Sequence, residues 1–393
     1  GGVQAYFALD CQMDEMSVAL GIDPVDFRLH NAVRDGDLGI AFGVRVSCSG
    51  LAACLKAGAE ATDWYNRHNH PAPDKSHRMR GWGVGTEMHT SGAYPAINEQ
   101  SNATLKMNED GTVHLFTGIA DLGTGSQTAL AQIAAEEMGL PLAAIRVTTG
   151  DTEVVPFDIG AYASRTVYIG GRAVQKAAID LKSQLLALAA AKLEKSADEL
   201  IFDSGMVKVK GQPETGFSFQ QLVRGEGSIS PRTLIGHSSY ESKVAYSYGA
   251  HFAEVEVDTR TGQIEVKQVT AVHEIGRAVY PKGVEGQIEG GIQQGLGHSL
   301  SEELVVDQQS GKVLNAGFVD YKMPLAVDMP EIKTIILEES PDPEGPFGAK
   351  GIGEDPIMAI GPAIANAVFD AIGVRFRELP ITPEMVLKAL KKM

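Results

Sequence analysis

Apolar positions recur at helical spacing near the start of the chain. Between residues 4 and 33 the spaced apolar residues are Ala8, Met13, Met16 and Leu20. The break Gly21-Ile22-Asp23-Pro24 predicts the start of a second short helix, because Asp is a good N-cap and Pro suits the first helical turn. Residues 51–66 predict another amphipathic helix, and residues 69–80, rich in Pro, His and Lys, are typical of a linker.

The pattern changes to strands after the linker. Residues 102–116 and 253–266 alternate apolar and polar positions on both sides of a turn, which predicts two β-hairpins. A glycine-rich loop and a helical pattern follow each hairpin, over 117–139 and 273–297. We therefore predict an α+β fold, with two α/β-type subdomains of mixed or antiparallel sheets and flanking helices that form a cleft, and an N-terminal helical segment.

Length, charge and cysteine content narrow the functional classes. The predicted domains are 1–80, 81–240 and 241–393, since 393 residues exceed one ordinary core. A formal charge of −16 disfavours nucleic acid as a partner, and no apolar run is long enough to cross a membrane. Only three cysteines are present, without CxxC spacing, so we expect neither a disulfide framework nor an iron–sulfur site here. The low cysteine content also predicts a cytoplasmic protein. The first residues show no charged-then-apolar pattern, so we expect no secretory leader.

A carboxylate inside a glycine-rich turn is the first candidate for chemistry. Residues 348–359 read GAKGIGEDPIMA, with Glu354 directly before a helix start at Asp355-Pro356. Glu354 could be a solvated anion near the positive end of that helix. Alternatively, the glycines let backbone N–H groups approach an anionic cofactor, and Glu354 acts as a base that accepts a proton. These residues alone favour the first reading.

Three further loops leave similar alternatives open. Residues 121–128 (DLGTGSQT) suit a phosphate or a polar heterocycle as well as a turn that caps a helix, and they fit neither a Walker loop nor a dinucleotide fingerprint. The small residues of 158–166 could accept a flat ring or a neighbouring helix. Residues 283–291 place glycines inside a helix at about 1 kcal/mol each relative to Ala, which implies close approach by a ligand or by another helix.

Protein ligands for a metal are not evident. The histidines are scattered, and the densest group, His68, His70 and His77, lies in the linker without a metal-binding spacing. We therefore expect no residue of this chain to ligate a metal.

The loops together resemble the molybdenum hydroxylases of the xanthine dehydrogenase and aldehyde oxidase family. The residues that carry the resemblance are GGVQAYFALDCQMDEM (1–16), GIDPVDFRLHN (21–31), TGIADLGTGSQT (117–128), GAYASRTVYIGGRAV (160–174), GVEGQIEGGIQQGLG (283–297) and GAKGIGEDP (348–356). They resemble the later, C-terminal part of the molybdopterin-binding large subunit. Residues 160–165 and 320–332 are most similar to the branch of 4-hydroxybenzoyl-CoA reductase, which adjoins hydroxylases of nicotinate and purines.

The resemblance implies a role for each matching residue. Glu354 matches the family's catalytic base. The implied cofactor-binding residues are Gly123, Thr124, Gly125, Ser126, Ala163, Ser164, Gln287 and Gly353, and the implied substrate pocket includes Tyr162 and Ala163. Thr124 departs from the family, which usually has glutamine between the two loop glycines, so its contact differs from the usual one.

The resemblance also implies cofactors and partners. The cofactor would be molybdopterin with molybdenum, the cytosine dinucleotide being one form, and 2Fe–2S clusters and FAD would sit on partner chains. Another partner would carry the other half of the molybdenum site. The implied reaction inserts oxygen derived from water into an N-heteroaromatic, purine-like or nicotinate-like, or into an aldehyde. The alternatives are reductive dehydroxylation of an aromatic acyl-CoA and a non-catalytic assembly subunit.

Overall fold

The N-terminal helices form where the apolar spacing predicts them. The computed structural model describes residues 1–39, 43–69, 77–224 and 232–391, so most of the predicted linker, including His70, lies outside the described residues. The helices of this region are α1 (Gly2–Leu20), α2 (Pro24–Asn31), α3 (Leu51–Ala61) and the short η1 (Trp64–Asn69). α2 starts at the break that the sequence predicts, and Asp23 caps it by accepting a hydrogen bond from Val25 N at 2.9 Å.

One mixed sheet has the order β1-β9-β10-β11. Its strands are β1 (Arg78–Ser91), β9 (Ala245–Asp258), β10 (Ile264–Glu274) and β11 (Glu331–Leu337). β1, β9 and β10 run antiparallel, which confirms the second predicted hairpin, while β11 runs parallel to β10. The helices that follow in this half are α7 (Pro281–Leu300), α8 (Pro356–Ile372) and α9 (Pro383–Leu390), with the short η5 (Ala326–Asp328) and η6 (Pro346–Gly348).

A second mixed sheet has the order β4-β3-β2-β8. Its strands are β2 (Glu99–Met107), β3 (Val113–Thr117), β4 (Ile145–Thr148) and β8 (Ile235–Ser242). β2 and β3 pair antiparallel from Ala103 opposite Thr117 to Met107 opposite Val113, which confirms the first predicted hairpin. The helices of this half are α4 (Ser126–Met138), α5 (Gly171–Leu193) and α6 (Phe219–Arg224), with the short η2 (Leu142–Ala144), η3 (Thr166–Gly170) and η4 (Ala197–Glu199).

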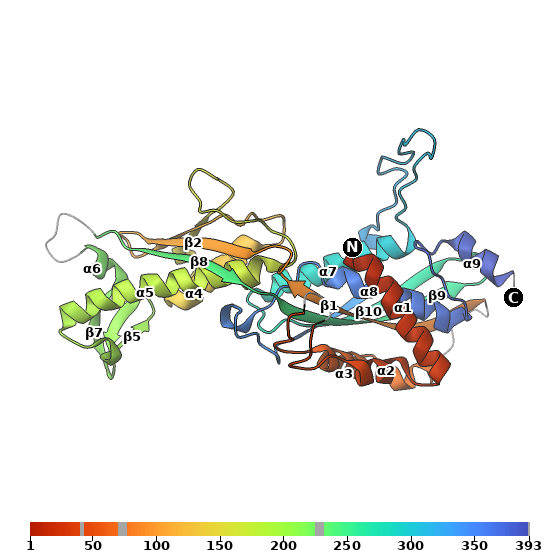
Figure 1. Ribbon diagram of the computed structural model, residues 1–393, viewed down its shortest axis with the longest axis horizontal. Coiled ribbons are helices and arrows are strands. Elements are labelled where there is room, and N and C mark those ends of the chain that lie inside the picture. The colour runs from red at the N-terminus through yellow and green to blue at the C-terminus, as the bar shows by residue number, and fades with distance from the viewer. Residues whose placement is uncertain (40–42, 70–76, 225–231, 392–393) are drawn as a thin grey trace.

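A small third sheet lies beyond α5 and was not predicted from the sequence. It has the order β5-β6-β7, with β5 (Leu200–Asp203), β6 (Met206–Val209) and β7 (Gln212–Ser218). In Figure 1 it lies at the far end of the molecule from α1, α8 and α9, and the two larger sheets follow one another along the long axis. The α+β prediction of two halves with mixed sheets and flanking helices is confirmed.

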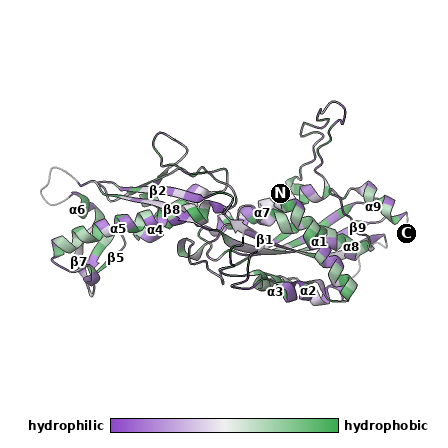
Figure 2. Cartoon of the chain, viewed as in Figure 1, coloured by the Kyte–Doolittle hydropathy of each residue, from purple (hydrophilic) through white to green (hydrophobic). Residues whose placement is uncertain are grey.

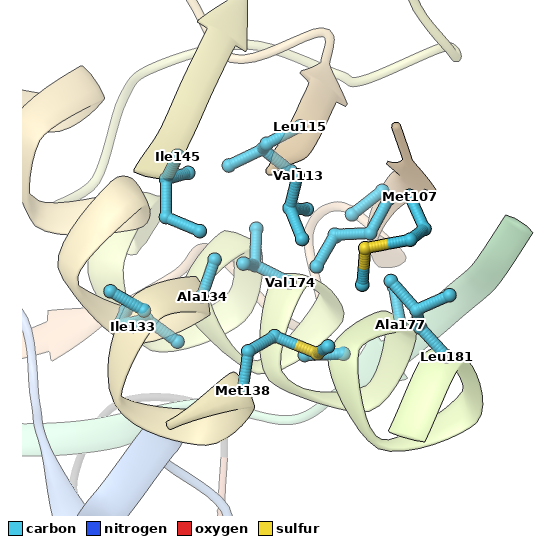
Figure 3. Packing of buried hydrophobic residues seen from close by; sticks show 14 of the residues in the cluster. Met107, Val113, Leu115, Ile133, Ala134, Met138, Ile145, Val174, Ala177 and Leu181 are labelled. Atoms are coloured by element: carbon cyan, nitrogen blue, oxygen red, sulfur yellow. The ribbon is translucent and has the colours of Figure 1, made fainter. Parts of the chain in front are cut away.

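Each half has its own hydrophobic core. The core of the β2–β3 half packs α4 and α5 against the sheet, with Met107, Leu115, Met138, Val174 and Leu181 meeting between them (Figure 3). Both helices carry hydrophilic and hydrophobic residues side by side along their length (Figure 2). Burial of such side chains contributes about 25 cal/mol per Å² of apolar surface, so these contacts hold the half together. A separate core lies between β9, β10, α7 and α8.

Three alternate glycines of β1 let α8 lie directly on that strand. Cβ atoms built at Gly81, Gly83 and Gly85 would come within 2.1–2.2 Å of carbonyl oxygens of α8. No other residue fits at such a separation, so the sequence GWGVG sets the distance between strand and helix. This contact brings the end of β1 next to the start of α8, where Glu354 lies.

The domain boundaries at residues 80 and 240 stay a prediction. β1, which runs across the first boundary, pairs along its length with β9, which follows the second. Within the part of the chain that the structure describes, no helix is long and apolar enough to cross a membrane.

Candidate active site

The four glycine-containing loops meet at one cavity of about 380 Å³. The lining residues come from segments 122–129, 161–167, 275–287 and 350–354, which are far apart in the sequence. They include most of the predicted site residues: Thr124, Ser126, Tyr162, Ser164, Gln287, Gly353 and Glu354. Gly123, Gly125 and Ala163 do not line it; all three adopt positive φ angles and shape the backbone beside it.

The first loop is folded around its own carboxylate. Asp121 accepts hydrogen bonds from the N–H groups of Gly123 (2.9 Å), Gly125 (3.2 Å) and Gln127 (3.2 Å). Burial alone would raise the pKa of Asp121, but these donors lower it below its ordinary value. The helix-capping alternative is therefore correct for these N–H groups, and they are not free to bind an anion.

One polar group of the same loop remains without a partner. Ser126 Oγ is buried, its residue is 3% exposed, and it has no hydrogen bond to the described residues. Because buried hydroxyls are normally hydrogen-bonded, this unpaired hydroxyl, on a residue that lines the cavity, is available to a polar ligand. The residues present therefore fit a polar cofactor in this cavity.

The second loop holds the backbone of Glu354. Ala163 (φ 44°) and Ser164 (φ 50°) are left-handed, which costs about 1–2 kcal/mol per non-glycine residue. Ser164 Oγ accepts hydrogen bonds from Gly353 N (3.2 Å) and Glu354 N (2.9 Å). It also contacts Asp355 Oδ2 at 3.3 Å, as the donor of that bond. The strained turn thus fixes the position of Glu354.

Asp355 is the N-cap residue of α8 and Pro356 its first residue, as predicted, but the Asp355 side chain makes no capping hydrogen bond. The carboxylate is fully buried and accepts from the hydroxyls of Ser164 and Ser247 instead. Burial raises the pKa of Asp355. The residue therefore links the second loop, β9 and the start of α8.

Arg165 anchors the second loop through buried ion pairs and hydrogen bonds. Its guanidinium contacts Glu99 Oε2 and Asp158 Oδ1, both at 2.7 Å, and donates to the carbonyls of Gly160 and Gln100. The three charged side chains are fully buried. A buried arginine that bonds two carboxylates and two backbone carbonyls holds a loop much more firmly than a surface ion pair.

Tyr162 is unsuited to accept or release protons at neutral pH. Its hydroxyl donates to Glu99 Oε1 at 3.1 Å. Burial, and then the charge of Glu99, raises the pKa of Tyr162 to about 12. The phenol stays neutral, so Tyr162 can shape the cavity but leaves Glu354 as the candidate base.

The glycines of α7 serve two purposes. A Cβ at Gly291 would lie 2.5 Å from Pro356 Cβ, so the helix-crossing alternative is correct there. Gln287, one turn earlier, lines the cavity. The side-chain amide of Gln287 could therefore still contact a ligand in the cavity.

Glu354 lines the cavity and carries a partly exposed carboxylate. The side chain is 55% exposed, and its Oε2 lies 3.3 Å from Nε2 of His89 on β1. The hydrogen bond from His89 lowers the pKa of Glu354, against the opposing effect of partial burial. Glu354 is therefore ionised at neutral pH, the state that a base requires.

Two basic residues, Arg277 and Lys350, line the cavity, and the charge of Lys350 is neutralised by a buried partner. The Lys350 ammonium contacts the Glu274 carboxylate, and both side chains are fully buried. Among the described residues, no group of three or more His, Cys, Asp or Glu side chains could hold a metal ion.

Sequence reasoning assigned no role to His89, Arg165 or Asp121. Asp121 and Arg165 stand inside loops that the sequence singles out, but only the fold shows what they bind. His89 lies 265 positions from Glu354, and no local pattern indicates that contact.

Comparison with known proteins agrees with this geometry. Residues 57–330 match the family described as molybdopterin cofactor-binding domain. The chain is 35% identical to the putative xanthine dehydrogenase molybdenum-binding subunit of Escherichia coli K12, over 98% of this chain and 52% of that protein. It is 30% identical to the nicotine 6-hydroxylase large subunit of Paenarthrobacter nicotinovorans, over 100% of this chain and 50% of that protein.

A solved structure has the same fold. Quinoline 2-oxidoreductase from Pseudomonas putida 86 superposes with a TM-score of 0.90 at 28% identity, over 98% of this chain and 52% of that one. The chain thus spans about half the length of the curated relatives it matches. These matches confirm the resemblance drawn from the loops: the chain belongs to the molybdenum hydroxylase family and carries its molybdopterin cofactor-binding domain.

Proposed function

We propose that this chain is part of the catalytic molybdenum-binding subunit of a multi-subunit hydroxylase or dehydrogenase. The observation that carries the proposal is the convergence of four loops on one cavity that Glu354 faces. In this proposal the cofactor supplies two-electron oxidation–reduction chemistry when bound. Glu354 removes the proton that must leave as water-derived oxygen is transferred to substrate.

The residues of this chain would hold the cofactor by neutral contacts. Ser126 Oγ has free hydrogen-bonding capacity, and Gln287, which also lines the cavity, offers an amide. Thr124 lines the same cavity with a hydroxyl shorter than the usual glutamine. Gly123, Gly125 and Ala163 act by backbone shape, and Gly353 leaves room beside Glu354.

An N-heteroaromatic is the substrate class that we favour. Two relatives and one structural neighbour are named for xanthine, nicotine and quinoline, which all contain a nitrogen heterocycle. The cavity wall offers apolar side chains for a flat ring, among them Leu122, Val279 and Ile352. An aldehyde is the alternative substrate. Reductive dehydroxylation of an aromatic acyl-CoA and a purely structural subunit are the competing functions.

The proposed partners follow from the same reading. We propose a segment or chain with the other half of the molybdenum site, and subunits that carry 2Fe–2S clusters and FAD. The three cysteines here are unpaired and provide no cluster site, in keeping with clusters on partner chains and with a cytoplasmic location.

Analysis of the native complex tests the function. We expect molybdenum and pterin in a stoichiometric amount, iron and flavin in the co-purifying subunits, and release of a cytosine nucleotide if the pterin is the dinucleotide form. Native complexes without molybdenum would overturn the proposal. Turnover of purine, nicotinate-like and aldehyde substrates would then select the substrate class.

Replacement of Gly125 by Val is expected to lower the molybdenum content on purification. Gly125 has φ 72°, and an added Cβ would lie 3.1 Å from Tyr280 Cε1 on the cavity wall. The valine side chain would therefore press on Tyr280, which lines the cavity, and change the space proposed for the pterin. Metal analysis of the purified variant measures the effect.

Gly139→Val is the matched control. Gly139 ends the same helix at φ 64°, but an added Cβ would meet nothing within 4 Å. It imposes the same backbone strain away from the cavity, so it should retain molybdenum. Equal loss from both variants would show that strain, not occupied cofactor space, is responsible.

A further inference from the structure

His89 provides the only side-chain contact to the Glu354 carboxylate among the described residues. Nε2 of His89 and Oε2 of Glu354 are 3.3 Å apart. The backbone of Glu354 is fixed by Ser164 Oγ, whereas its half-exposed side chain would otherwise be free to rotate. Ordering a glutamate side chain costs up to about 2 kcal/mol in conformational entropy. A fixed hydrogen-bond partner is therefore needed to hold the Glu354 carboxylate in one orientation.

The strand holds His89 rigidly. His89 lies on β1, opposite Ser247 of β9, and its side chain is only 18% exposed. Ser247 Oγ lies 3.4 Å from the His89 carbonyl oxygen and also donates to the Asp355 carboxylate. Ser247 therefore links β9, which pairs with β1 at His89, to the start of α8, where Glu354 is attached.

The charges around His89 favour its imidazolium form. Two carboxylates face it, Glu354 through the hydrogen bond and the buried Asp355 through its charge. Burial lowers the pKa of His89, but the two carboxylates outweigh burial and raise it above its ordinary value. No arginine or lysine among the described residues forms an ion pair with Glu354 or Asp355, so His89 supplies the local positive charge.

We propose that His89 is a positioning residue that holds the Glu354 carboxylate in one orientation beside the cavity. This inference rests on the proposed function, because it matters for catalysis only if Glu354 is the base. His89 itself transfers no proton to substrate. It acts through the charge and the direction of its bond to Glu354.

His89→Gln tests the charge. Glutamine keeps a hydrogen-bond donor but removes the cation, so the pKa of Glu354 should rise. The carboxyl ¹³C shift of Glu354, followed against pH in glutamate-labelled full-length protein and assigned with Glu354→Gln, measures this without reference to turnover. The acid limb of kcat/KM should move to higher pH, because the base is then protonated sooner as the pH falls.

His89→Lys separates charge from direction. Lysine keeps the cation on a longer, flexible stem, so the acid limb should stay at low pH. Because a small misplacement of a base can cost about 100-fold, kcat of this variant should fall about 10- to 100-fold with little change in KM. The variant also guards against a His89→Gln protein that does not fold.

His237→Gln is the matched control. His237 is an exposed histidine on β8 that contacts Thr104, away from Glu354. It should change neither the pKa of Glu354 nor the pH profile. Suppose that Glu354→Gln is inactive, but that His89→Gln changes neither the pKa of Glu354 nor the acid limb of kcat/KM. That result would overturn the role of His89 and leave the base assignment intact. An active Glu354→Gln protein would overturn the base assignment, and the role of His89 with it.

Discussion

Glu354→Gln should lower turnover by about 10²- to 10⁴-fold, the range over which a positioned general base contributes. Glutamine has almost the same shape and can still contact His89, but its amide cannot accept a proton at neutral pH. Molybdenum content should be unchanged, because the cofactor-facing groups of the other loops remain. Steady-state kinetics together with metal analysis of the same preparation check both parts.

The combination of the two measurements separates the competing functions. A non-catalytic assembly subunit would show no loss of turnover on this substitution. Glu285→Gln is the control, since Glu285 is an exposed carboxylate of α7 that does not line the cavity. Full activity in Glu354→Gln would end the assignment of Glu354 as base, and loss of molybdenum would show that the carboxylate serves cofactor binding instead.

The sequence predicts the elements of this fold better than their contacts. Both hairpins form as expected, because period-two alternation and a turn are local signals. The small sheet of β5, β6 and β7 was missed, since its strands are short and its apolar positions face the end of α5. The pairing of β1 with β9 could not be predicted from the sequence either. The two strands lie about 160 residues apart, and no local sequence pattern indicates which residues of such distant strands pair.

For the candidate site, too, the sequence predicts the segments better than the contacts between their side chains. Glycine-rich loops indicate where a ligand could approach, and the structure brings their residues to one cavity. The sequence could not say that Asp121 would occupy the N–H groups of the first loop or that Ser126 Oγ would be left without a partner. Such facts depend on the direction of single side chains, which the fold as a whole decides.

Arg165→Met should destabilise the protein by about 3–5 kcal/mol, the usual cost of removing one partner from a buried ion pair. The substitution leaves the carboxylates of Glu99 and Asp158 buried without their cation. It also releases the loop that presents Ser164 to the backbone of Glu354, so bound molybdenum should fall as well. Thermal and urea unfolding of the variant measure the first effect, and metal analysis measures the second.

Arg377→Met supplies the surface control, since Arg377 pairs with Glu15 at 2.9 Å while 73% of its side chain is exposed. Exposed pairs contribute about 0–1 kcal/mol, so this variant should unfold close to the unaltered protein. Adding Glu99→Gln and Asp158→Asn to Arg165→Met should recover part of the loss, because neutral amides are less costly to bury than unpaired carboxylates. If Arg165→Met is as stable as Arg377→Met, the buried ion cluster does not hold the second loop, and the strained turn at Ala163 and Ser164 must be held by packing alone.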